Sequence, residues 1–441
     1  NLRNFINNIC SPQRAQNDIS LMAESESQSE TQSESQSESE TQSESQSESQ
    51  SESESQSESE SQSESESQSE SESQSESESE KESETETQDP NVPEGYKGIY
   101  KVSDLSLLSS KPDGKYMLMA DLDLNSAEQA SISVFRGTLD GNNHTIKGLK
   151  HALFQVLEEG TVSNLNLSSV QISGSGDAGA LANVIGTGKK SAVTIQNITI
   201  TGSVTGTGNT GALAGVLKGT DVVISRIANS ATVAGTANAG GLIGLVQATD
   251  DQEGAASVKL TESYNIGEVS AVTAGGLIGA AEIPNLAAAR NIEIANCYNA
   301  GVLEKGANIV AKITAGNGQV VINKCVGIQF YYSVASGMVG TSTMAAGSTQ
   351  TSGCSISNSY YYSMNPVYAF ETGNCITGTA TALNDVQIKT QSYFKDFDFD
   401  GIWALNAAEN GGYPYLKQTT MLPVVKKQGL TVSGNGDFGV E

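Results

Sequence analysis

His144 and His151 are the only histidines in the chain, and no other side chains are better suited to acid–base or metal chemistry. A zinc peptidase site needs His-Glu-x-x-His on a helix, and neither histidine stands in that pattern. His144 follows the turn-forming Gly141-Asn142-Asn143, so we expect a structural role there rather than a ligand role. No Gly-x-Ser-x-Gly elbow or phosphate-binding glycine loop is present. The sequence therefore predicts no catalytic residue, no metal ligand and no cofactor, and a chain that is not an enzyme.

Two groups of aspartates could bind a cation. Asp396-x-Asp398-x-Asp400-Gly401 matches the first half of a calcium loop, but Ala407 stands where the bidentate Glu belongs. We therefore interpret this stretch as alternating strand residues and keep a calcium site as the alternative. Asp121, Asp123 and Asp140 could gather at the start of the fold, where solvated carboxylates are the default expectation.

The five cysteines contain no Cys-x-x-Cys pair, so neither a zinc knuckle nor a thioredoxin-like site is predicted. Cys297 and Cys325 occupy the same position in successive repeats. Stacked repeats would put their Cα atoms about 4.8 Å apart, within disulfide range. We favour two reduced, buried cysteines that act as small apolar fillers, with a disulfide as the alternative. Cys354 is expected in the core.

The elements that hold these residues are revealed by a repeat. A Gly/Ala-Leu-small-Gly block recurs at spacings of 32, 29 and 35 residues. Its copies are Gly179-Ala180-Leu181-Ala182, Gly211-Ala212-Leu213-Ala214-Gly215, Gly240-Gly241-Leu242-Ile243-Gly244 and Gly275-Gly276-Leu277-Ile278-Gly279, with weaker copies at 151–154, 306–309 and 336–340. A period near 30 with strand-like segments is typical of a solenoid with one coil per repeat, here about seven coils.

A second set of positions repeats in step with the first. An apolar position recurs as Val162, Ile195, Ile224, Leu260, Ile294, Ile322 and Ile356, and three residues later come Leu165, Ile198, Ile227, Ser263, Cys297, Cys325 and Ser359. Between them lies Asn at 164, 197, 296 and 358. Asn tolerates the left-handed backbone of a tight corner. We therefore predict stacked ladders with an Asn corner.

The acidity of the chain belongs to one segment. Residues 21–90 carry 22 Glu and one Asp against one Lys, which is −22 of the formal net charge of −27. Ser or Thr alternates there with Glu or Gln, so the segment has no apolar face to bury and is predicted to be a disordered, solvated tail. Glycosylation or phosphorylation of its serines is the alternative. Without Lys/Arg clusters, no nucleic acid partner is expected.

Domain boundaries follow from these changes in composition. We expect an unassigned leader or fragment at 1–23, the Ser/Glu/Gln tail at 24–95, an N-terminal cap with first strands at 96–150, β-helix repeats at 151–380, a C-terminal cap at 381–417 and a linker at 418–441. Ser103 should N-cap a helix over 104–108, and 383–389 should form a short helix. Trp403 should plug the far end of the stack. No transmembrane segment is visible.

These residues resemble a known family. The Gly-Gly-Leu-Ile-Gly blocks are similar to the GLUG motif of bacterial cell-surface repeat proteins. The entry segment 135–149 and the exit segment 398–416 are similar to elements that open and close such domains. Related repeats occur in the non-catalytic region of Gram-positive immunoglobulin A-specific zinc metallopeptidases. The resemblance implies an all-β, right-handed parallel β-helix that is secreted or on the cell surface.

The tail also resembles stalk segments of Gram-positive surface proteins. The resulting hypothesis is a non-catalytic surface or secreted module, stalk or adhesin-like, monomeric, with an unknown surface protein or glycan as its ligand. One alternative is an accessory domain of a larger surface metallopeptidase whose catalytic part lies elsewhere. Another is a polysaccharide-active β-helix enzyme, which would need paired carboxylates in a groove.

Overall fold

The computed structural model describes residues 89–129, 132–248, 254–303, 305–328, 334–362, 372–373, 375–422, 430–432 and 438–440. The chain divides into two units, Asn1–Ser83 and Glu84–Glu441, and only the second contains described residues. The predicted leader and most of the predicted tail therefore lie outside the described residues.

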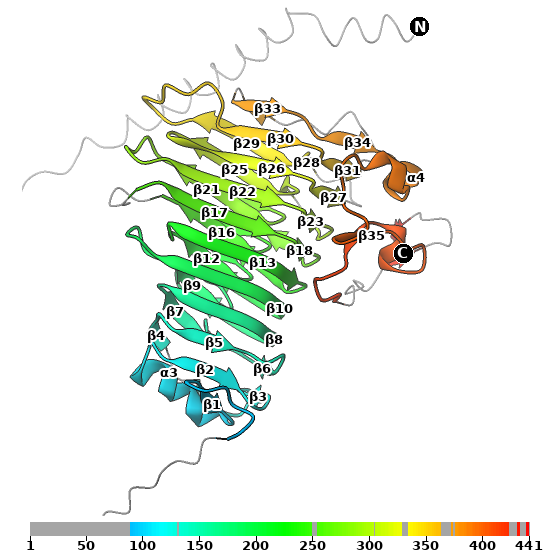
Figure 1. The fold of residues 1–441 in the computed structure, drawn as a ribbon. Coiled ribbons are helices and arrows are strands. Elements are labelled where there is room, and N and C mark those ends of the chain that lie inside the picture. The colour runs from blue at the N-terminus through cyan, green and yellow to red at the C-terminus, as the bar shows by residue number, and fades with distance from the viewer. Residues whose placement is uncertain are drawn as a thin grey trace, which may run out of the picture. The chain divides into compact units, whose positions relative to one another are not determined.

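The described chain is a parallel β-helix whose coils stack on one another (Figure 1). Each full coil has three faces, which we number in the order in which the chain passes through them. Face three is a sheet of nine parallel strands among the described residues: β4 (Ile132–Phe135), β7 (Phe154–Leu157), β9 (Ala182–Ile185), β12 (Ala214–Leu217), β16 (Ile243–Gln247), β21 (Ile278–Ile283), β25 (Val310–Ala315), β29 (Val339–Met344) and β32 (Thr372–Gly373). The seven predicted repeats supply β7 to β29, and β4 and β32 continue the stack at its two ends.

Faces one and two lie on either side of a corner. Face one contains β1 (Lys97–Ile99), β2 (Lys115–Leu118), β5 (Thr138–Asp140), β8 (Gly160–Gly174), β10 (Ala192–Gly206), β13 (Asp221–Asn229), β17 (Ala256–Thr261), β22 (Arg290–Ala295), β26 (Gly318–Asn323), β30 (Cys354–Ser357) and β33 (Ile376–Gly378). Face two contains β3 (Leu122–Asp123), β6 (Thr145–Lys147), the second halves of β8, β10 and β13, then β18 (Tyr264–Asn265), β23 (Tyr298–Asn299), β27 (Val326–Ile328), β31 (Tyr360–Tyr362) and β34 (Thr381–Leu383).

Shorter strands close each coil between faces two and three. They are β14 (Thr232–Gly235), β19 (Val269–Ser270), β11 (Thr210–Gly211), β15 (Asn238–Gly240), β20 (Thr273–Gly275), β24 (Lys305–Ala307) and β28 (Val334–Ser336). The glycine blocks lie just where these strands turn into face three. At Gly276 an added Cβ would lie 2.1 Å from the Asn308 carbonyl oxygen of the next coil. The blocks are therefore glycine because the coils approach each other closely there.

The predicted ladders are confirmed by the strand pairings. Val162, Ile195 and Ile224 are paired in register, and the same row continues through Leu260, Ile294, Ile322 and Ile356. All of its members are buried. The predicted corner is confirmed too, since Asn164, Asn197, Arg226, Glu262, Asn296, Lys324 and Asn358 all have φ between 43° and 56°. The parallel pairings establish a β-helix, and its right-handedness stays a prediction.

The N-terminal end of the stack is covered by a 3-10 helix, η1 (Val102–Leu105), that runs into α3 (Ser106–Ser110). Leu105 and Leu108 point into the core below them. The prediction that Ser103 caps this helix is wrong. Lys101 is the N-cap residue, because the Asp104 carboxylate accepts the N–H groups of Tyr100 and Lys101 at 2.9 and 3.2 Å.

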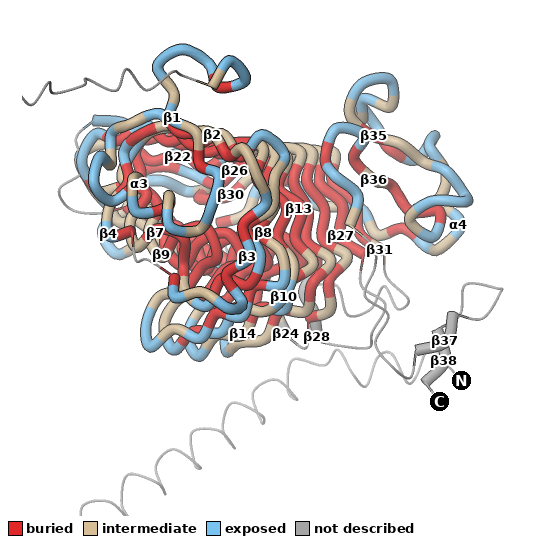
Figure 2. The backbone as a smooth tube through the Cα atoms, turned by 90° about the horizontal axis from the view of Figure 1, so that it is seen from below, coloured by how far each residue is buried: buried red, intermediate tan, exposed pale blue. Residues whose placement is uncertain are grey.

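The C-terminal cap, residues 384–422, is placed differently from its prediction. Its elements are α4 (Asp385–Ile388), η3 (Gln391–Tyr393), η4 (Asn410–Gly412) and an antiparallel pair, β35 (Trp403–Ala404) and β36 (Tyr415–Leu416). Asn384 caps α4 within the predicted helix at 383–389. The prediction that Trp403 plugs the end of the stack is wrong, since the cap lies against the side of face two (Figures 1 and 2). A further antiparallel pair, β37 (Leu430–Val432) and β38 (Phe438–Val440), follows in the sequence.

Candidate functional site

A row of side chains on the outside of face two forms the surface against which the cap packs. We call it the tyrosine row; its members are paired in register from coil to coil: Ala228, Tyr264, Tyr298, Val326 and Tyr360. Because side chains alternate along a strand, the residue that follows each tyrosine of β18 and β23 points inward. Those inward residues are Asn265 and Asn299, so a Tyr-Asn pair places an aromatic ring outside and an amide inside.

The cap covers the tyrosine row with its own aromatic residues. Trp403 is fully buried, with its ring centroid 6.2 Å from that of Tyr298 and 4.9 Å from that of Phe397. Phe394 meets Tyr360 edge to face at 5.1 Å. The burial of these rings removes a large apolar area from water, which supplies the main attraction between cap and face two.

Hydrogen bonds hold the cap in register with the coils. The Trp403 indole N–H donates to the corner residue Asn296 at 3.1 Å, and the Tyr360 hydroxyl accepts the Lys395 N–H at 2.8 Å. Further down the stack, the Tyr264 hydroxyl donates to the Thr420 carbonyl at 2.7 Å and accepts the Leu422 N–H at 2.8 Å. The cap therefore runs from the last coil back along the side of the stack as far as Tyr264.

Burial under the cap changes the acidity of the tyrosines. It raises the pKa of Tyr264 to about 12, although the hydrogen bond from the Leu422 N–H opposes this shift. Burial likewise raises the pKa of Tyr298 well above its ordinary value. Within the cap, burial and the hydrogen bond to the Asp385 carboxylate raise the pKa of Tyr413. These phenols stay neutral across the physiological range, so the interface is uncharged at its centre.

A ladder of amides lies behind the tyrosine row inside the β-helix. The Asn229 side-chain N–H donates to Asn265 Oδ1 at 2.8 Å, and Asn265 donates to Asn299 Oδ1 at 2.9 Å. Each of these amides also accepts the backbone N–H two residues ahead, at Ala231, Gly267 and Gly301. Buried amides are tolerated because they satisfy one another and the turn that follows each strand. Neither row was predicted, although Tyr-Asn-x-Gly recurs in the sequence at 264–267 and 298–301 and is a signal for both.

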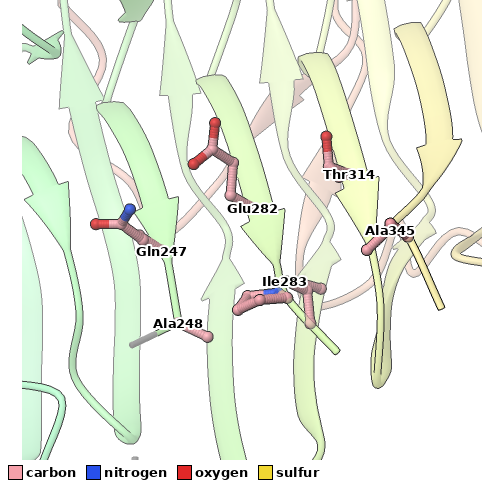
Figure 3. A pocket seen from close by; sticks show the side chains of 8 residues that line it. Gln247, Ala248, Glu282, Ile283, Thr314 and Ala345 are labelled. Atoms are coloured by element: carbon pink, nitrogen blue, oxygen red, sulfur yellow. The ribbon is translucent and has the colours of Figure 1, made fainter. Parts of the chain in front are cut away.

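An open hollow of about 530 Å³ lies at the ends of the face-three strands (Figure 3). Gln247, Glu282 and Thr314 stand in register on β16, β21 and β25 and line it. The rest of its lining is Ala248, Ile283, Pro284, Ala345 and Ala346. One amide, one carboxylate and one hydroxyl can hydrogen-bond a polar ligand. Among the described residues that line the hollow, Glu282 supplies the only carboxylate.

The two histidines contact neighbouring residues in the first coils. His144 Nδ1 lies 3.0 Å from Asp121 Oδ1, and the same oxygen accepts the Thr145 N–H at 2.8 Å. The hydrogen bond from the Thr145 N–H has the larger effect and the contact with His144 the smaller, and both hold the pKa of the Asp121 carboxyl below its usual value. His151 Nδ1 lies 3.3 Å from the Ala152 carbonyl. The structural role expected for His144 stays a prediction.

The aspartates do not come together. Asp123 pairs with Asn125 and Lys147, and Asp140 accepts from Asn142 and Asn164. The prediction of strand residues at 396–400 is wrong. Asp398 accepts the N–H groups of Asp400 and Gly401 at 3.0 and 2.8 Å, which makes a turn. Among the described residues no group of three or more His, Cys, Asp or Glu could hold a metal ion.

The cysteines lie where the ladders predict. Cys297, Cys325, Cys354 and Cys375 are all buried, and Cys354 pairs with Val320 in an apolar row of face one. The predicted stacking of Cys297 and Cys325 is confirmed, and the choice between reduced fillers and a disulfide stays a prediction. Cys10 lies outside the described residues.

Comparison with known proteins places part of this fold. Residues 100–202, from η1 to β10, match the family described as the M26 IgA1-specific metallo-endopeptidase N-terminal region. The predicted resemblance to these peptidases is confirmed. The likeness to the GLUG motif stays a prediction.

Curated relatives agree with this match over a short stretch. The chain is 34% identical over 116 residues to an immunoglobulin A1 protease of Streptococcus sanguinis, which is 24% of this chain and 6% of that protein. The immunoglobulin A1 protease of Streptococcus pneumoniae (strain ATCC BAA-255 / R6) gives the same identity and coverage. Halomucin of Haloquadratum walsbyi (strain DSM 16790 / HBSQ001) is 32% identical over 124 residues, which is 23% of this chain and 1% of halomucin. The chain thus spans a small part of the M26 relatives it matches.

Two solved structures also align with part of the chain. A putative immunoglobulin A1 protease from Bacteroides ovatus aligns with a TM-score of 0.44 at 19% identity, over 73% of this chain and 92% of that one. An IgA1 protease structure aligns with a TM-score of 0.44 at 18% identity, over 74% of this chain and 26% of that one. In the part of the chain that the structure describes, no helix has the length and apolar character needed to cross a membrane.

Proposed function

We propose that this chain is a non-catalytic β-helix module, secreted or on the cell surface, that serves as an accessory part of a larger M26-type protease. The match of residues 100–202 to the N-terminal region of that family carries the proposal. The fold supports it, because side chains with catalytic potential are dispersed over the coils while the best-built surface, the tyrosine row, is occupied by the cap.

The cap determines where the chain leaves the β-helix. A stack that ended at β34 would pass the chain on from its last coil. The cap instead returns along face two, and Tyr264 holds residues 420–422 against the side of the stack. Residue 422, the last of this described segment, therefore lies beside the coils rather than beyond them.

Activity on immunoglobulin A1 tests the non-catalytic part of this proposal. Purified chain is incubated with human immunoglobulin A1 in the presence of zinc, and the heavy chain is followed by electrophoresis and mass spectrometry. We expect no cleavage over a day at equimolar protein. Cleavage that a metal chelator abolishes, and that persists after further purification, would overturn it.

A stalk or adhesin-like role is the second candidate, favoured by the acidic Ser/Glu/Gln segment that precedes the fold. Antibody labelling of intact producing cells, with and without surface proteolysis, tests the location that both candidates require. Signal that appears only after lysis would contradict both. Binding of the chain to host glycans or surface proteins, without any dependence on a linked protease, would favour the second candidate over the first.

A further inference from the structure

Cys297 and Cys325 stand directly above one another in successive coils. The residues on both sides of them are paired in register, Ala295 with Asn323 and Tyr298 with Val326. The Val326 N–H donates to the Cys297 carbonyl at 2.9 Å, so the two strands are in contact at the cysteines themselves. Strands paired in this way hold opposite Cα atoms about 4.8 Å apart, inside the range that a disulfide spans.

Both thiols are buried, and each contacts a carbonyl of the preceding coil, Leu260 for Cys297 and Ile294 for Cys325, at 3.5 Å. Cys297 Sγ donates to the Ala295 carbonyl at 3.3 Å, and Cys325 Sγ donates to the Asn323 carbonyl at 3.5 Å. In the coils on either side the same position is serine. Ser263 and Ser359 make the equivalent contacts at 2.7 and 2.9 Å. Serine therefore fits this position in the coils on either side of the cysteine pair.

We propose that Cys297 and Cys325 are a redox-sensitive pair, which an oxidant of the disulfide class closes to a disulfide between successive coils. The new bond joins the two sulfur atoms, and each thiol gives up its proton. The two electrons reduce the oxidant's disulfide to two thiols, which take up the two protons. The bond closes a loop of the chain between residues 297 and 325.

The surroundings decide when this reaction takes place. Both thiols are fully buried in the folded coils. Burial, followed by the neighbouring Cys325, raises the pKa of the Cys297 thiol well above its usual value. Because a thiolate is the attacking species, the folded chain reacts slowly, and the bond forms while the coils assemble.

The bond would lie beneath the cap-binding surface. Tyr298 and Val326, which follow the two cysteines, are members of the tyrosine row and pack against the cap. A link between these two coils fixes the spacing of those two members. Oxidation during folding would therefore stabilise both the coils and the part of the tyrosine row on which the cap packs.

Cys354 and Cys375 provide a built-in comparison. They also lie in neighbouring coils, but Cys354 is paired with Ile376, so the two cysteines are out of register by one residue. Cys375 Sγ instead lies 2.6 Å from Ser342 Oγ. Because Cys375 is out of register with Cys354 and its thiol contacts Ser342, this pair is expected to stay reduced.

Refolding under two redox conditions tests the proposal. The full chain is unfolded with a reductant, refolded with oxidised and reduced glutathione or with reductant alone, then alkylated and digested for mass spectrometry. We expect a single 297–325 cross-link after oxidative refolding, alkylated Cys354 and Cys375, and a melting temperature higher by about 3 °C or more than after reductive refolding. Fully alkylated cysteines, or scrambled pairs, would overturn it.

Serine variants separate the bond from the fold. Cys297→Ser should fold, because serine already occupies this position in the adjacent coil, and should lose both the cross-link and the redox-dependent rise in melting temperature. Cys375→Ser is the matched control and should keep both. If Cys297→Ser retains the rise, the stabilisation has another source and the proposal fails.

Discussion

Tyr264 and Tyr298 stack face to face on the outside of successive coils, with ring centroids 4.7 Å apart and ring planes inclined by 2°. This geometry follows from the pairing of β18 with β23, which places identical side chains one above the other. The C-terminal cap packs on these two stacked rings, since the Tyr264 hydroxyl binds residues 420 and 422 and the Tyr298 ring packs against Trp403. The stacked tyrosines therefore connect the repeated coils to the C-terminal cap.

Trp403→Ala should release the cap without unfolding the coils. The indole is fully buried between Tyr298 and Phe397, and replacement of a buried Trp by Ala costs about 3–5 kcal/mol. Trypsin should then cut rapidly after Lys395 and Lys417, while the β-helix strands keep their protection from hydrogen exchange.

Tyr393→Ala is the control for this cap variant, because its side chain is 44% exposed. It should change stability by no more than about 0.5 kcal/mol and leave trypsin cleavage slow. Equal protease resistance of wild type and Trp403→Ala would show that the cap does not depend on the tyrosine row.

Alkaline pH should loosen the cap through Tyr264. Its pKa is raised from about 10 when unfolded to about 12 when folded, so the folded chain favours the neutral phenol. The corresponding stabilisation, about 3 kcal/mol, is fully present below pH 10 and is lost as the pH rises from 10 through 12. Urea unfolding at a series of pH values measures this loss.

Tyr264→Phe should flatten this pH dependence and lower stability by about 1 kcal/mol at pH 7, because it removes the hydroxyl bonded to Thr420 and Leu422. A residual slope is expected from Tyr298 and Tyr413, whose pKa values are also raised. An unchanged slope in the variant would rule out Tyr264 as a source.

The internal amide ladder should be costly to interrupt. Asn265→Ala removes the acceptor for the Gly267 N–H and the link from Asn229 to Asn299. Buried groups left unsatisfied should lower the free energy of unfolding by about 2–4 kcal/mol, measured by urea denaturation. Asn291→Ala, on the exposed side of face one, should have little effect. Similar losses in both variants would argue against the ladder.

The corner row predicts one stabilising substitution. Lys324 adopts φ of 53° at a position that is Asn in the coils on both sides, Asn296 and Asn358. Lys324→Asn should raise stability by about 0.5–1 kcal/mol, since Asn adopts the left-handed region more readily. Asn197→Ala should act in the opposite direction by about 1–2 kcal/mol. Thermal unfolding of both variants checks the sign, and a destabilised Lys324→Asn would contradict this account of the corner.

The sequence alone was enough to predict the repeat, the apolar ladders and the Asn corner. Stacking places equivalent residues in contact with one another, so a row such as Ile195, Ile224 and Leu260 is visible as a period in one dimension. The positive φ at Asn164 and Asn197 has the same origin, because only certain residues accept that backbone.

Only the tertiary structure decided where the non-repeating parts lie. The sequence predicts that Trp403 is buried, because a large aromatic side chain needs an apolar partner. The periodicity of the repeat does not tell whether the end or the side of the stack supplies that partner. The partner is Tyr298, more than a hundred residues earlier, which projects outward because its neighbour Asn299 is held inside by other amides. The sequence by itself determined what stacks on what within the coils, while the side on which the cap packs depended on contacts between distant segments that no repeat encodes.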